Sequence, residues 1–138
     1  MEKTLTTVIL TKNEEKTIKQ VILNTQKCAA NVLVVDSGSS DKTVEIAEKC
    51  GAKVVYRAWD DDFAAQRNFA LQHVTTPWVL YLDADEFLDA DLTAAIKNVL
   101  ASDENKQYSM LRKSHAFGFV YEEILRELQS AGSSGEFY

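Results

Sequence analysis

The stretch that decides the fold is Trp78-Val79-Leu80-Tyr81-Leu82-Asp83-Ala84-Asp85-Glu86, an apolar run that ends in three acids within four residues. An apolar run of this length predicts a β-strand that is buried on both faces, as in a parallel sheet. The acids then lie where the strand leaves the sheet, and they repel each other unless a cation lies between them. Ligands of open α/β sheets bind beyond the carboxyl ends of the strands. We therefore interpret this edge as a site for a divalent cation that carries a phosphate.

The rest of the N-terminal part alternates strand and helix. Further strands are expected at 5–11, 32–36 and 53–57, and helices after Asn13, over 43–50, over 63–74 and over 92–100. Asn13 is expected to cap the first of these helices and Gly51 to end the second. Strands that alternate with helices at this spacing indicate βαβ units. We predict an α/β fold, a three-layer αβα sandwich around a mainly parallel central sheet.

The pattern weakens after Ser102. Residues 107–111 are expected to form a further strand, 120–128 a helix, and 130–135 a flexible tail of small residues. The expected organisation is one domain over 1–112, followed by a C-terminal helix and flexible tail over 113–138.

Composition excludes several classes of function. The formal net charge of −6 argues against a nucleic-acid-binding surface, which needs a basic stripe. No apolar stretch approaches the roughly 20 residues of a membrane span, and Glu2 and Lys3 lead straight into a strand rather than a signal peptide. Cys28 and Cys50 lack metal-ligand spacing and are expected to be free thiols in a reducing compartment. We expect a cytoplasmic location.

Polar groups follow the end of each predicted strand. They are Thr11 with Lys12, Asp36 with Ser37, the residues after Arg57, and Asp83 with Asp85. In a parallel sheet these ends share one edge. Two simpler readings stay open, because Thr11 could be a helix cap and Asp36 could bond only its own turn amides. Together the groups indicate a nucleotide site whose diphosphate is bridged by Mg²⁺ or Mn²⁺ to Asp83 and Asp85.

Four blocks in order resemble family 2 glycosyltransferases with the GT-A fold. They are Val8-Ile9-Leu10-Thr11-Lys12-Asn13-Glu14-Glu15, Val34-Val35-Asp36-Ser37-Gly38-Ser39-Ser40-Asp41-Lys42-Thr43, Ala64-Ala65-Gln66-Arg67-Asn68-Phe69-Ala70 and Leu80-Tyr81-Leu82-Asp83-Ala84-Asp85-Glu86. The resemblance covers the nucleotide-sugar-binding half of such enzymes. It is nearest to the branch that acts on lipopolysaccharide core and related cell-surface glycans.

The resemblance implies transfer of a sugar from a nucleotide-diphosphate donor, commonly UDP-linked, with inversion and a divalent metal. Thr11 and Glu14 match the first-strand motif that lines the nucleotide, and Asp36 matches the acid that contacts the base. Arg67 lies in the block that closes over the nucleotide. Asp83 matches the first acid of the family's DxD motif, near ribose and metal, and Asp85 matches the acid that ligates the metal. The implied acceptor is a glycan or a lipid-linked glycan, with peripheral association at the inner face of the membrane.

One departure from the family pattern leaves the catalytic residue unknown. Family members normally continue well past this length, and the later segment supplies the acceptor wall and an Asp or Glu base. Nothing after Ser102 clearly matches that base, since Glu122 and Glu123 fit a solvated helix face and His115 stands alone. Two further classes therefore stay open: a non-catalytic or truncated nucleotide-sugar-binding module, and a receiver-like signalling domain. The receiver class fits less well, because a receiver carries a pair of acids just after its first strand, where this chain has Thr11-Lys12-Asn13.

Overall fold

The computed structural model describes residues 4–101 and 136–137, and it places five parallel strands in one sheet. The strands are β1 (Leu5–Thr11), β2 (Asn31–Asp36), β3 (Lys53–Tyr56), β4 (Trp78–Asp83) and β5 (Glu136–Phe137), in the spatial order β3-β2-β1-β4-β5. The helices are α1 (Ile18–Thr25), α2 (Thr43–Lys49), α3 (Phe63–Leu71) and α4 (Ala90–Ala101). The strand and helix of 107–111 and 120–128 lie outside the described residues, as does the tail at 130–135.

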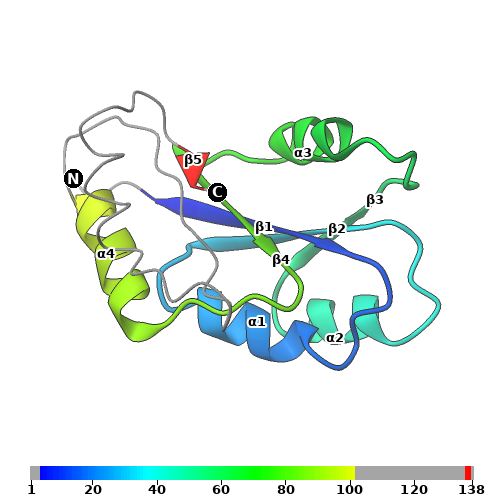
Figure 1. The fold of residues 1–138 in the computed structure, drawn as a ribbon, viewed down its shortest axis with the longest axis horizontal. Coiled ribbons are helices and arrows are strands. Elements are labelled where there is room, and N and C mark those ends of the chain that lie inside the picture. The colour runs from blue at the N-terminus through cyan, green and yellow to red at the C-terminus, as the bar shows by residue number, and fades with distance from the viewer. Residues whose placement is uncertain (1–3, 102–135, 138) are drawn as a thin grey trace, which may run out of the picture.

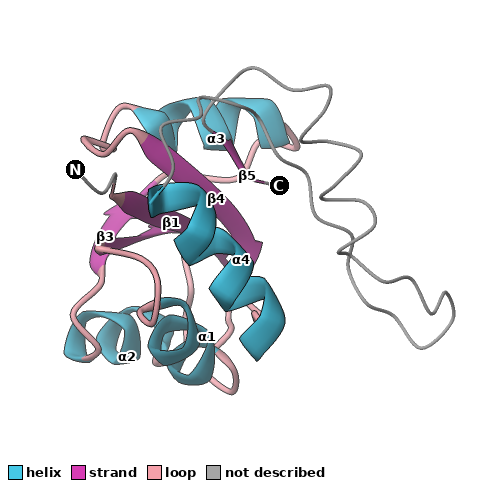
Figure 2. Ribbon diagram, turned by 90° about the vertical axis from the view of Figure 1, so that its left-hand side faces the viewer, coloured by secondary structure: helices cyan, strands magenta, loops and turns pink. Residues whose placement is uncertain are grey.

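The helices cover both faces of the sheet. Figures 1 and 2 show α1, α2 and α4 on one face and α3 on the other. The predicted three-layer α/β sandwich with a parallel sheet is thus confirmed. None of the helices in the described residues has the length and apolar character that crossing a membrane requires.

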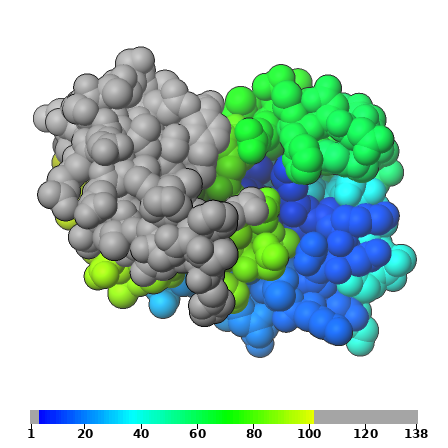
Figure 3. Space-filling model, viewed as in Figure 1, coloured from blue at the N-terminus to red at the C-terminus, as the bar shows by residue number. Residues whose placement is uncertain are grey.

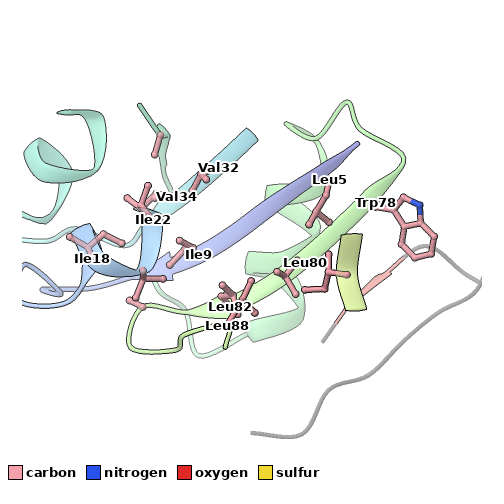
Figure 4. Packing of buried hydrophobic residues seen from close by; sticks show 14 of the residues in the cluster. Leu5, Ile9, Ile18, Ile22, Val32, Val34, Trp78, Leu80, Leu82 and Leu88 are labelled. Atoms are coloured by element: carbon pink, nitrogen blue, oxygen red, sulfur yellow. The ribbon is translucent and has the colours of Figure 1, made fainter. Parts of the chain in front are cut away.

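Two apolar clusters hold these layers together. The larger cluster lies under α1, α2 and α4, and Figure 4 shows how Ile18 and Ile22 of α1 pack beside Ile9 of β1 and Val34 of β2. The smaller cluster lies under α3 and contains Val8, Leu33, Val35, Ala70 and Val79. Successive residues of β1 and β2 therefore supply opposite clusters, which explains why both strands contain consecutive apolar residues, Val8-Ile9-Leu10 in β1 and Val32-Leu33-Val34-Val35 in β2. A buried pair of hydroxyls, Thr7 and Thr25 at 2.7 Å, joins β1 to α1.

The expected start of the first helix is wrong. Helix α1 begins at Ile18, with Thr17 as its N-cap residue, and Asn13 lies in the preceding loop with φ at 55°. Its side chain accepts a hydrogen bond from the backbone N–H of Ser40 at 2.8 Å. Asn13 therefore ties two loops together instead of capping a helix, and asparagine suits this role because it tolerates the left-handed region.

Gly51 ends helix α2 as the sequence predicts. Its φ is +89°, and a Cβ built there would meet only Gln26 Nε2, at 3.9 Å. The cost of a larger residue is therefore backbone strain rather than collision. Gly51→Ala is expected to lower the free energy of unfolding by about 1 kcal/mol, measured by urea denaturation. Gly51→Asn should lose less, because asparagine adopts this conformation more readily. Equal losses in the two variants would contradict the backbone explanation.

Candidate functional site at the carboxyl edge of the sheet

The ends of four parallel strands bring the predicted site residues to one edge. Thr11 of β1 is in register with Asp36 of β2, and Leu10 of β1 is in register with Asp83 of β4. Asp36 is in turn opposite Tyr56, the last residue of β3. In Figure 3 this edge lies on the right, where blue residues of the β1–α1 connection border cyan residues of the β2–α2 connection. The expectation that these groups share one edge follows from the parallel topology and is met.

Asp36 lies at the centre of this edge and is buried, at 3% exposed. Its Oδ1 accepts hydrogen bonds from Thr11 Oγ1 at 2.7 Å and Ser39 Oγ at 2.6 Å. Its Oδ2 accepts from the backbone N–H groups of Gly38 at 3.0 Å and Ser39 at 2.8 Å. Burial alone would raise the pKa of this carboxyl, but the bonds from Ser39, Thr11 and Gly38 outweigh burial and lower the pKa. Asp36 thus holds the β2–α2 turn in shape as an ionised group.

A second set of hydrogen bonds ties the β1–α1 connection to the β2–α2 connection. The backbone N–H of Asn13 donates to Ser39 Oγ at 2.8 Å, and that of Glu14 donates to Thr43 Oγ1 at 2.8 Å. From the other side, the N–H of Ser40 donates to Asn13 Oδ1. Because these bonds satisfy loop amides without a ligand, the edge is preorganised before anything binds.

Gly38 provides a close approach on this surface. Its φ is +107°, and an added Cβ would lie 3.4 Å from Lys12 Nζ and 3.6 Å from the Tyr56 ring. Lys12 Nζ also donates to the Gly38 carbonyl at 2.6 Å. A cation and an aromatic ring therefore lie within van der Waals contact of a backbone position that has no side chain.

The turn after β4 is braced on two sides. The backbone N–H of Asp83 donates to Glu86 Oε1 at 2.7 Å, and the N–H of Glu86 donates to the Asp83 carbonyl at 3.1 Å. Thr17 Oγ1, at the start of α1, donates to the Ala84 carbonyl at 2.7 Å. Asp83 is half-buried and Asp85 is exposed. The two carboxylates thus leave a fixed turn on the side that faces the β1–α1 connection.

Glu14 faces these acids across the edge. Burial raises the pKa of its carboxyl, and the charges of Asp85, Asp41 and Asp83 raise it further. The field at this edge is therefore negative, so a cation would be attracted there. Within residues 4–101 and 136–137, no three His, Cys, Asp or Glu side chains are grouped so that they could hold a metal ion by themselves. Two carboxylates nevertheless fit Mg²⁺ or Mn²⁺, which take one or two protein carboxylates together with phosphate oxygens and water.

Arg67 reaches this region from the other layer. It is exposed on α3, and its guanidinium carbon lies 5.3 Å from the centre of the Tyr81 ring. Tyr81 is in β4, two residues before Asp83, so the cation–π contact holds a positive charge near the acids. The sequence suggested Arg67 but not Tyr81, Thr17 or Glu86. Tyr81 could have been inferred from the two-residue alternation of a strand, which places it on the same face as Asp83. Thr17 could not have been inferred, because its contact with Ala84 spans 67 residues.

A separate hollow of about 320 Å³ lies at the opposite, amino edge of the sheet. Its lining includes Thr6, Asn31, Lys53 and His73 but none of the predicted site residues. This hollow is therefore separate from the carboxyl edge, where the acids and hydroxyls described above lie.

The sequence matches known proteins over most of its length. The family model for glycosyl transferase family 2 matches residues 6–119. An uncharacterized glycosyltransferase of Rickettsia bellii is 40% identical over 108 residues, which are 78% of this chain and 36% of that protein. The lipopolysaccharide core biosynthesis glycosyltransferase LpsC of Rhizobium meliloti is 32% identical over 123 residues, 85% of this chain and 45% of that protein. The chain spans about 36% of the length of the first of these relatives.

Solved structures share the fold. Residues 1–349 of S. aureus TarS align with a TM-score of 0.68 and 23% identity, covering 85% of this chain and 38% of that one. The glucosyl-3-phosphoglycerate synthase of Mycobacterium tuberculosis, in complex with Mn²⁺, UDP and glucosyl-3-phosphoglycerate, aligns with a TM-score of 0.63 and 22% identity. That alignment covers 93% of this chain and 51% of the synthase. At these identities the likeness establishes the fold alone.

Proposed function

Because this chain belongs to glycosyl transferase family 2, as the match over residues 6–119 shows, we propose that it carries the donor site of a glycosyltransferase. The donor would be a nucleotide-diphosphate sugar, with UDP as the expected nucleotide. The observation that carries the proposal is the arrangement of Asp83 and Asp85 beyond β4, beside the strand ends that hold Thr11 and Asp36. No other described edge gathers carboxylates, hydroxyls and turn amides in this way.

Each residue has a physical role in this proposal. Thr11 and Asp36 hold the turn over which the base and ribose would lie, and the base would lie near Gly38 and the ring of Tyr56. Glu14 lines the same surface from the β1–α1 connection. Arg67, held over Tyr81, supplies a positive charge toward the phosphates. These groups bind and orient the donor, and orientation is a large part of catalysis in group transfer.

Asp83 and Asp85 would hold Mg²⁺ or Mn²⁺. A bound divalent ion supplies Lewis-acid stabilisation of the charge that develops on the leaving diphosphate. The two carboxylates would fix the position of that ion, because Glu86 and Thr17 brace the turn on which the carboxylates lie. An inverting transfer also requires a base that takes the proton of the acceptor hydroxyl. We assign no described residue to that role.

For the acceptor we propose a cell-surface glycan or a lipid-linked glycan of the lipopolysaccharide-core type. Support comes from the 32% identity to LpsC, whose name places it in lipopolysaccharide core biosynthesis. The relatives are longer than this chain, so we propose the transfer to an acceptor as an activity of the whole protein. A donor-binding module without transfer activity is the second candidate, because none of the described residues is assigned as the base that transfer requires.

Donor binding is tested by calorimetry with UDP. We expect UDP to bind at least about tenfold more tightly in Mn²⁺ than in EDTA, because uncompensated carboxylates repel the diphosphate. Uridine is the matched control, since it lacks phosphates and its affinity should not respond to Mn²⁺. Equal UDP affinity in Mn²⁺ and EDTA would reject the metal-assisted donor site.

An assay of sugar transfer distinguishes a glycosyltransferase from a donor-binding module without transfer activity. An assay of UDP release from a UDP-sugar, run with and without lipopolysaccharide-core acceptors, measures acceptor-dependent turnover. Stimulation by acceptor would favour a complete transferase. Tight donor binding with no stimulation would favour the donor-binding module.

A further inference from the structure

The connection between β3 and α3 is a second ordered feature of the same edge, at the right of Figure 1. Arg57 donates to Asp60 through its two terminal guanidinium nitrogens, at 3.2 and 3.0 Å, and also donates to Gln66 Oε1 at 2.6 Å. Asp62 caps α3 by accepting from the N–H of Ala65 at 3.0 Å. These bonds fix both ends of the loop, and none of them is used by the donor site described above.

The fixed loop presents two large aromatic side chains to solvent. Trp59 is 41% exposed and Phe63 is 61% exposed, and their rings meet edge to face with centres 4.7 Å apart. Trp59 Nε1 donates to Asp61 Oδ1 at 2.9 Å. Asp61 has φ at 61°, a left-handed conformation that aspartate adopts more readily than most residues. The hydrogen bond and the ring contact therefore hold an exposed tryptophan beside an exposed phenylalanine, and clustered exposed apolar side chains mark interaction sites.

The charge of the residues beside Trp59 and Phe63 limits which class of ligand can bind to these two rings. Asp60, Asp61 and Asp62 are all exposed beside the rings. An anionic lipid surface, a nucleic acid or a phosphate would be repelled by this row of carboxylates. A neutral sugar would not be, because its hydroxyls donate hydrogen bonds to carboxylates. The faces of aromatic rings carry partial negative charge and attract the C–H groups on the flat side of a pyranose. A basic peptide would be attracted by the carboxylates of Asp61 and Asp62, which Arg57 leaves uncompensated, so it is the competing ligand in the test below.

We propose that Trp59 and Phe63, with the carboxylates of Asp60, Asp61 and Asp62, form a saccharide-binding platform. The loop leaves β3 directly after Tyr56, and the N–H of Arg57 donates to the Asp36 carbonyl at 3.0 Å, so the platform adjoins the proposed donor edge. The proposal rests on the proposed function in one respect, namely that the saccharide is part of the acceptor glycan.

Tryptophan fluorescence tests the platform directly. The chain has two tryptophans, and Trp78 is only 1% exposed, so acrylamide quenches mainly Trp59. Maltotriose, cellotriose and chitotriose are the probes. We expect at least one of them to reduce acrylamide quenching about twofold, with a dissociation constant on the order of 1–10 mM. Phe63→Ala, which keeps the reporter, should weaken this binding about fivefold. Leu23→Ala removes an exposed apolar side chain on α1 and should change nothing.

Three results would overturn the platform. They are a lack of protection by all three trisaccharides, protection by a basic peptide (heptalysine) but by no sugar, and an equal loss of UDP affinity in Phe63→Ala, which would place the loop in the nucleotide site. The proposed function fails separately, since UDP affinity in Mn²⁺ and EDTA is measured on the unchanged chain. Sugar protection of Trp59 with no metal effect on UDP would reject the donor site and keep the platform.

Discussion

Replacing Asp85 with asparagine is expected to weaken UDP binding in Mn²⁺ by about 100-fold, because loss of a metal ligand costs at least as much as loss of a residue that supports one. The same substitution should leave UDP affinity in EDTA unchanged or slightly higher, since it removes one charge that repels the diphosphate. Asp85 is exposed in a turn that Glu86 and Thr17 brace, so the fold should persist. Calorimetry in Mn²⁺ and in EDTA, with circular dichroism as a check on folding, gives both values.

The matched control is Glu48→Gln, which removes one exposed acid from α2. It changes the net charge by the same amount as Asp85→Asn, so a general charge effect would appear in both variants. A second readout comes from Glu14, whose raised pKa owes part of its shift to Asp85. In Asp85→Asn the pKa of Glu14 should fall, as NMR titration of its carboxyl carbon would show. An equal loss of UDP affinity in Mn²⁺ and EDTA would mean that Asp85 binds no metal.

The strands could be predicted because a strand that is buried on both faces requires apolar residues at consecutive positions. β1 occupies Leu5–Thr11 as expected, and β4 is the apolar run from Trp78 to Asp83. Helix faces were equally legible, since Ile18, Val21 and Ile22 recur at helical spacing and are all buried. The parallel topology then places the strand ends at one edge, so the location of the candidate site followed from the sequence.

The loops were not predictable in the same way, because their hydrogen bonds join residues far apart in the chain. Asn13 is a residue type that often caps helices, yet the N–H group that donates to its side chain belongs to Ser40, 27 residues away. Local preference therefore gave the wrong start for α1. The bonds from Thr11 to Asp36 and from Thr17 to Ala84 span 25 and 67 residues. No short-range pattern specifies such contacts, although they set the shape of the site.

Asp36 illustrates what the sequence left open. An acid at the end of a buried strand could contact a nucleotide base or could bond its own turn amides. The structure shows the turn bonds, with Ser39 and Gly38 as donors, and Thr11 as a further donor. Contact with a base stays a prediction, and it now concerns a carboxylate whose two oxygens already accept four hydrogen bonds.

Substituting Asp36 with alanine is therefore expected to destabilise the fold by about 3 kcal/mol, because several donors lose a charged acceptor in a buried setting. Urea denaturation at pH 7 measures the loss. Asp36→Asn is the matched variant: it keeps the shape but turns an amide N–H₂ toward donors, so it should lose about 2 kcal/mol. UDP affinity, measured below the unfolding transition, shows whether Asp36 also contacts the base. A drop in affinity with unchanged stability would contradict the role in the turn.

The pH dependence gives an independent test of the same carboxylate. The pKa of Asp36 is lower in the folded chain than its ordinary value of 3.8. A carboxyl with a lowered folded pKa contributes stability that is present above the unfolded pKa and is lost as pH falls through the folded pKa. The stability advantage of the natural chain over Asp36→Asn should therefore be constant above about pH 5 and shrink as pH falls below about 3.8. Urea denaturation at a series of pH values measures this difference. An advantage that stayed constant down to pH 2 would mean that the charge of Asp36 does not hold the turn.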